Sequence, residues 1–208
     1  MEKMDRRGAL KILGSAPLVA GAMLGEATAA QAHKHVRQAK AAAAKGTVFK
    51  PRFFTDHEYK TVRVLADMII PKDEKSGSAT QAGVPEFMDF IMMDDKLLTD
   101  RQTRQTAMRG GLAWLDLECE RRFNKTFLDC TDAEKMKVLD DIAYPAKARK
   151  EMSHGVAFFN MFRDLTATGF WTSQMGMEDL QFIGNVFVSE WTGCPDEALK
   201  KLNVKYGD

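Results

Sequence analysis

Hydrophobic residues recur every three or four positions along most of the chain after residue 54, as they do on amphipathic helices. The segment "TDHEYKTVRVLADMIIP" begins with a capping box, Thr55 with Glu58, and ends at Pro71. The same spacing predicts further helices over residues 84–95, 131–143, 155–169 and 177–191. Another helical region passes through Gly110-Gly111 and continues to Phe123. No segment alternates polar and apolar residues long enough for a strand. The pattern predicts an all-α fold, a single compact multi-helix domain over residues 54–208.

The spacing also predicts which side chains are buried. In the segment 131–143, a second capping box joins Thr131 to Glu134. The apolar stripe that follows is predicted to be Met136, Leu139 and Ala143, one face of a helix.

The first 32 residues have a different pattern, a basic segment followed by small apolar residues. The uncharged run from Ile12 to Gly25 is too short and too weakly hydrophobic for a membrane-spanning helix, which needs about 20 apolar residues. The order of basic, apolar and small residues is typical of a signal peptide over residues 1–32, with cut sites after Ala29 and Ala32. The pair Arg6-Arg7 predicts export by the twin-arginine route.

Residues 33–53 are basic and Ala-rich, and we expect a solvated linker there. About 175 residues then remain after removal of the signal, the size of one domain. Hydrophobic residues make up 45% of the chain, and the formal net charge is +1 without a long basic block. This balance argues against nucleic acid as a partner.

Cysteine use depends on the compartment. Export implies an oxidising environment in which disulfides persist. Cys119 and Cys130 are 11 positions apart, which on one continuous helix separates them by about 16 Å. A disulfide needs Cα atoms within about 7 Å. We therefore do not expect this pair unless the chain turns back sharply near Asn124.

The third cysteine, Cys194, lies on a stiff turn between Gly193 and Pro195. Two interpretations stay open from the sequence. Cys194 forms a disulfide with another chain, or it is a buried free thiol, since unpaired cysteines are often buried.

No motif for catalysis or cofactor binding is present in the sequence. There is no C-x-x-C-H for haem, no G-x-G-x-x-G after a strand and no G-x-S-x-G elbow. The four histidines, His33, His35, His57 and His154, are scattered rather than clustered as zinc ligands would be. We predict no catalytic, cofactor-binding or metal-binding residue in this chain, so any cofactor is expected in a partner.

Several stretches resemble the small subunit (gamma, subunit 3) of gluconate 2-dehydrogenase and related FAD-dependent membrane-bound sugar dehydrogenases. The most specific are the run "GFWTSQMGMEDLQFIGN" over residues 169–185 and "WTGCP" over residues 191–195. Shorter stretches that resemble the family are "LADMIIP", "AGVPEFMD", "GLAWLD" and "KVLDDIA". The loop over residues 72–78 departs from the family pattern, being charged where a proline-glycine turn is expected.

The resemblance implies a periplasmic complex held at the inner membrane through its other subunits. Its large subunit carries FAD and oxidises a sugar or sugar acid, and a multihaem cytochrome c subunit, with haem c, passes on the electrons. The small subunit binds and stabilises the flavoprotein and takes it through the twin-arginine translocase. Phe170, Trp171 and Trp191 are candidate anchors of the interface with the flavoprotein, near the candidate interchain disulfide at Cys194.

Two other hypotheses stay open. The chain is a free-standing periplasmic enzyme or binding protein with a pocket that no motif reveals, or its signal stays uncut and tethers it to the inner membrane.

Overall fold

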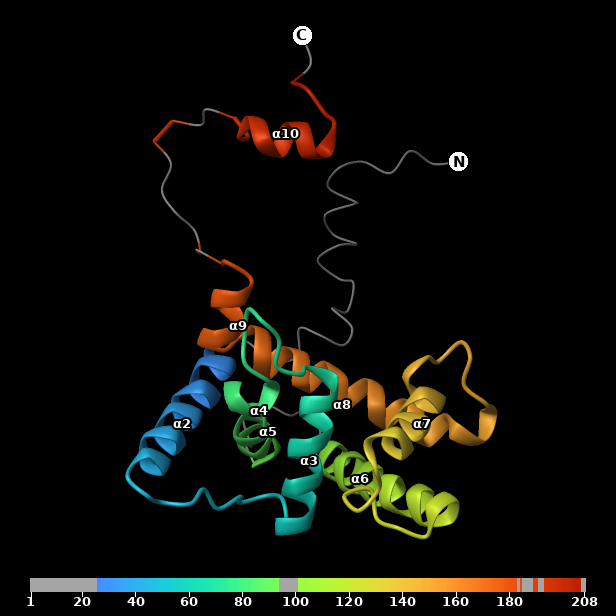
Figure 1. The fold of residues 1–208 in the computed structure, drawn as a ribbon. Coiled ribbons are helices and arrows are strands. Elements are labelled where there is room, and N and C mark those ends of the chain that lie inside the picture. The colour runs from blue at the N-terminus through green and yellow to red at the C-terminus, as the bar shows by residue number, and fades with distance from the viewer. Residues whose placement is uncertain (1–25, 94–100, 183, 185–188, 191–192, 207–208) are drawn as a thin grey trace, which may run out of the picture.

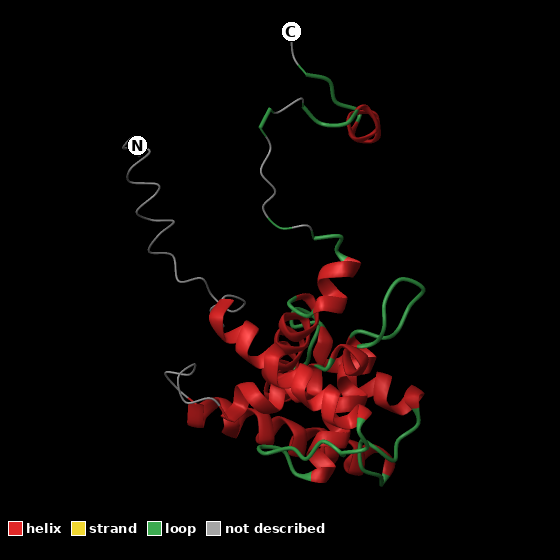
Figure 2. Cartoon of the chain, turned by 90° about the vertical axis from the view of Figure 1, so that its left-hand side faces the viewer, coloured by secondary structure: helices red, strands yellow, loops and turns green. Residues whose placement is uncertain are grey.

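The structure, a computed structural model, describes residues 26–93, 101–182, 184, 189–190 and 193–206. Every regular element in these ranges is a helix (Figure 2). The predicted all-α class is therefore confirmed. The helices are α2 (Glu26–Ala44), α3 (Asp56–Ile69), α4 (Ala79–Ala82), α5 (Val84–Met93), α6 (Arg101–Phe123), α7 (Asp132–Ala143), the 3₁₀ helix η1 (Lys150–Met152), α8 (Ser153–Trp171), α9 (Gln174–Asp179) and α10 (Asp196–Leu202).

Helix α8 lies along the centre of the bundle (Figure 1). It packs against α4, α5, α6, α7 and α9, while α2 packs against α5. The fully buried side chains are mostly large and apolar, and they join the helices into one core. The largest of them are Phe87, Phe127, Phe162, Phe170, Leu65, Met88, Ile91, Met92, Met108, Leu115 and Ile142.

Capping boxes fix where three helices begin. Both predicted boxes are present, Thr55 with Glu58 at α3 and Thr131 with Glu134 at α7. A third box begins the one-turn helix α4, where the Ser78 hydroxyl accepts from the Gln81 N–H. Each box satisfies backbone N–H groups that the first helical turn leaves unpaired.

The segment predicted to be a solvated linker is in its first half a packed helix, so the prediction is wrong for residues 33–44. Ala32 and Val36 on α2 are buried against α5, and Lys40 Nζ donates to the Gln81 carbonyl over 2.6 Å. The close approach depends on Gly83, where an added Cβ would lie 2.3 Å from Val36 Cγ1. Alanine favours helix, and its small side chain lets α2 approach the domain.

The predicted helix over residues 177–191 ends early. Helix α9 stops at Asp179, and Gln181 and Gly184 have left-handed φ angles of 54° and 72°. The Phe182 N–H donates back to the Met177 carbonyl over 2.9 Å, which closes the turn. Beyond it, α10 lies apart from the bundle (Figure 1) and has no buried residue.

Candidate functional site

An apolar groove runs between the first turns of α2 and the end of α8 with α9. It has a volume of about 460 Å³. Its lining residues are Ala29, Ala30, His33, Arg37, Trp171, Thr172, Met177, Leu180 and Phe182. Four of them are large apolar side chains that stay exposed to solvent: Trp171 at 38%, Met177 at 38%, Leu180 at 56% and Phe182 at 66%. Met177 belongs to α9, and Leu180 and Phe182 to the turn at which α9 ends.

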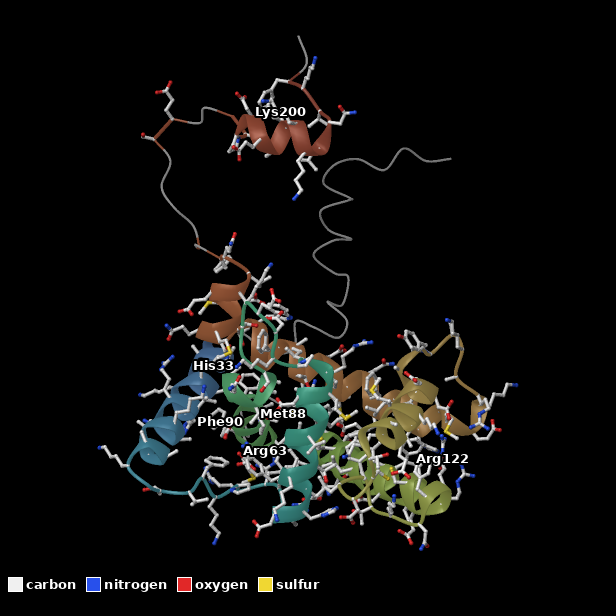
Figure 3. The ribbon with its side chains drawn as sticks, viewed as in Figure 1. His33, Arg63, Met88, Phe90, Arg122 and Lys200 are labelled. Atoms are coloured by element: carbon white, nitrogen blue, oxygen red, sulfur yellow. The ribbon has the colours of Figure 1, made fainter. Side chains whose placement is uncertain are left out.

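His33 holds the two walls of the groove together. It lies at the end of α2 nearest α9 (Figure 3), stacks on Phe87 with ring centroids 5.0 Å apart, and its Nε2 lies 2.7 Å from Thr172 Oγ1. The Thr172 hydroxyl donates its one proton to the Thr168 carbonyl, so His33 must donate from Nε2. Burial, then the charges of Arg37 and Lys40, lower the pKa of His33, which favours the neutral ring.

The groove contains one of the three predicted interface anchors. Trp171 lines it. Phe170 is fully buried in the core of this chain, so its side chain offers no surface to a partner here. Successive residues of a helix point about 100° apart, and it is Phe170 that faces inward. Trp191 lies outside the described residues. Leu180 belongs to the segment predicted to be a helix over residues 177–191, and the turn after α9 leaves it exposed.

A second cleft lies between α6 and α8 and has a volume of about 350 Å³. It is lined by Ala107, Gly110, Gly111, Trp114, His154, Ala157, Phe158 and Met161. His154 is the one ionisable side chain among these lining residues. General acid–base catalysis needs a second positioned group or an activated nucleophile, and this lining provides neither.

His57 and Asp116 form a hydrogen-bonded pair, with Nε2 and Oδ2 2.6 Å apart. The other carboxylate oxygen accepts from the Phe127 N–H over 2.9 Å. Cys119 follows Asp116 by one helical turn, but it is fully buried. Burial first, then the neighbouring Cys130 and the charge of Asp116, raise the pKa of the Cys119 thiol to about 12. A thiol with that pKa is a poor nucleophile near neutral pH, so the three residues do not form a reactive constellation.

In the ranges that the structure describes, no three His, Cys, Asp or Glu residues lie close enough together to hold a metal ion. The buried charges are occupied in structural contacts. Asp89 accepts from the N–H groups of Arg52, Phe53 and Phe54, and Glu118 binds Arg121 and Arg122. Arg122 lies among the side chains of α6 and α7 (Figure 3).

The predicted export and disulfide residues have different outcomes. Arg6 and Arg7 lie outside the described residues. Ala29 and Ala32, the predicted cut sites, lie within α2, and Ala32 is completely buried. Cys194 is exposed, not buried in a core, and its N–H donates to the Tyr206 hydroxyl. Whether Cys194 bonds to another chain stays a prediction.

None of the described helices combines the length and the apolar character needed to cross a membrane. Comparison with family models gives a match to gluconate 2-dehydrogenase subunit 3 over residues 56–190. Neither curated proteins nor solved structures give a match to this chain. The matched range runs from the first residue of α3 past α9 and takes in most of the helical bundle. The chain therefore belongs to the gluconate 2-dehydrogenase subunit 3 family.

Proposed function

We propose that this chain is the non-catalytic small subunit of a periplasmic FAD-dependent sugar or sugar-acid dehydrogenase. It binds and stabilises the flavoprotein subunit and carries it through the twin-arginine route. Family membership supports the role of a subunit. The observation that carries the proposal further is the apolar groove, because it gives the chain a surface for a protein partner.

The groove has the chemistry of a protein interface. Interface centres are rich in aromatic residues, Met and Arg and poor in other charges, and here Trp171, Phe182 and Met177 stand beside Arg37. A small-molecule site would need several polar groups converging on one ligand. In this groove the His33 ring is already engaged with Thr172. We therefore assign the groove to the flavoprotein.

The exposed Cys194 supplies a second link in this proposal. It belongs to the segment containing α10, in which Leu202, Val204 and Tyr206 are all at least half exposed. In an oxidising compartment, an exposed thiol on such a segment is available for a disulfide to the flavoprotein. A multihaem cytochrome c subunit would hold the complex at the inner membrane and accept its electrons.

Co-purification from the native source tests the groove. The tagged full chain should co-elute with a flavoprotein, recognised by the absorbance of bound flavin. The double variant Trp171→Ala/Phe182→Ala should lose at least nine-tenths of the co-eluting flavin. Leu117→Ala is the matched control, because Leu117 is 69% exposed on α6 and does not line the groove. Equal loss in both variants, or no flavoprotein with the parent chain, would contradict the proposal.

Co-export is tested separately with Arg6→Lys/Arg7→Lys. Both this chain and the flavoprotein should then stay in the cytoplasm. If the flavoprotein still reaches the periplasm, it does not depend on this chain for export.

A further inference from the structure

The chain turns back on itself between α6 and α7 and brings two cysteines together. Helix α6 ends at Phe123, and Asn124 has a left-handed φ of 57°. Cys119 and Cys130 are both buried in the same apolar core, and both are free in the structure. The sharp turn near Asn124, the one condition under which the sequence allowed this pair, is therefore present.

One hydrogen bond holds the returning segment against α6, and two others fix Cys130 within the turn and against α7. The Phe127 N–H donates to the Asp116 carboxylate on α6 over 2.9 Å. Within the turn, the Cys130 N–H donates to the Thr126 carbonyl over 3.2 Å. From α7, the buried Lys135 Nζ donates to the Cys130 carbonyl over 2.7 Å. The Phe127–Asp116 contact thus places the segment that contains Cys130 along the stretch of α6 that contains Cys119, without involving either sulfur.

We propose that Cys119 and Cys130 form an intrachain disulfide once the protein has been exported, joining the end of α6 to the start of α7. The proposal rests on the proposed export to an oxidising compartment. The two thiols together lose two protons and two electrons, and one sulfur–sulfur bond forms. The electrons pass by thiol–disulfide exchange to the disulfide of a dithiol oxidase, which is reduced to two thiols.

Burial decides how this disulfide forms and how long it lasts. Cys119 is fully buried and Cys130 is 4% exposed, so an oxidase reaches them only when the turn around residues 124–131 opens. A reductant meets the same barrier after the bond has formed. Cys194, by contrast, is exposed. The chain therefore carries two kinds of thiol, a buried pair within one chain and an exposed thiol available to another.

Counting thiols in Cys194→Ser tests the proposal. Full chain from the periplasm, denatured and treated with a maleimide reagent, should show no reactive thiol, and reductant should restore two. A tryptic peptide pair joined through Cys119 and Cys130 should appear by mass spectrometry without reductant. Cys119→Ser/Cys194→Ser is the control and should leave Cys130 reactive. Two reactive thiols in the exported Cys194→Ser chain would overturn the proposal.

A second arm separates this proposal from the export proposal. The reduced, purified Cys194→Ser chain is incubated with oxidised glutathione. Formation of the Cys119–Cys130 bond supports the pairing even if the chain is found in the cytoplasm. Mixed disulfides with glutathione on both cysteines, without the joined peptides, would overturn it.

Discussion

Two adjacent glycines of α6 provide a sharp test of how closely α6 and α8 pack. An added Cβ at Gly110 would meet no atom within 4 Å. At Gly111 it would lie 1.9 Å from Phe158 Cδ2 and 2.1 Å from Phe158 Cγ. We therefore expect Gly110→Ala and Gly111→Ala, the same chemical change on neighbouring residues, to shift stability in opposite directions.

The magnitudes follow from the two environments. Replacing a helical glycine with alanine stabilises a helix by roughly 1 kcal/mol, and Gly110→Ala should gain this amount in full. Gly111→Ala gains the same helix stabilisation but overpacks the core, which costs about 1–3 kcal/mol of stability. Phe158 is 4% exposed, so its ring cannot swing into solvent and the cost should lie at the upper end. The two variants should therefore differ by about 3 kcal/mol.

Thermal unfolding followed by circular dichroism measures the difference. For a domain of this size, about 3 kcal/mol corresponds to roughly 6–12 °C in Tm, with Gly110→Ala above the parent and Gly111→Ala below it. Urea unfolding at 25 °C gives the free energies directly. A Gly111→Ala variant as stable as Gly110→Ala would refute the close contact between α6 and Phe158.

Three further predictions concern a buried carboxylate, an ion cluster and the N-terminus. Asp89→Ala leaves the buried N–H groups of Phe53 and Phe54 unpaired, which should cost about 3–5 kcal/mol in urea unfolding, whereas the exposed Asp140→Ala should stay within about 0.5 kcal/mol. Burial opposes ionisation of Glu118, but hydrogen bonds from Arg121 and Arg122 hold its pKa below the usual 4.5. Glu118 therefore stabilises the fold above pH 4.5, and this contribution is lost as the pH falls through its lower folded-state pKa. When the pH is lowered from 7 into the acid range, Glu118→Gln should lose less stability than the parent protein. An equal loss in both proteins would contradict the reasoning. Cleavage after Ala29 keeps the fully buried Ala32 in the core, so N-terminal sequencing of the exported chain should begin at Ala30; a start at His33 would show that this contact is dispensable.

Local signals in the sequence predicted most of the helices but not all of their buried faces. Thr55 and Thr131 were identifiable as N-caps because a capping box is contained within four residues. In α7 the predicted stripe is confirmed at Leu139, which is buried, but Met136 is 47% exposed while Val138 and Ile142 are buried. Lys135 is also buried on that face, and a charged residue in the stripe obscured the hydrophobic period.

Features that depend on contacts between segments far apart in the sequence could not be predicted from the spacing of residues within one segment. Helix α2 was missed because its buried stripe consists of Ala29, Ala32 and Val36 among charged and polar residues. The groove needs α2 and α9 side by side, which no spacing within either segment predicts. The proposed pairing of Cys119 with Cys130 depends on one left-handed residue, Asn124, a conformation that asparagine tolerates but does not require.

The contact between His33 and Thr172 has a consequence for the order in which the protein is made. These residues are 139 positions apart, so α2 leaves the ribosome long before the partner that fixes its first turns. At about 5–20 residues per second, synthesis of the intervening chain takes roughly 7–28 s. Helix α5 is made early in that interval and can pack against α2, but the end of α8 is still missing. The contact that fixes the first turns of α2, the helix that contains the predicted cut sites, therefore forms only when nearly the whole bundle has been synthesised.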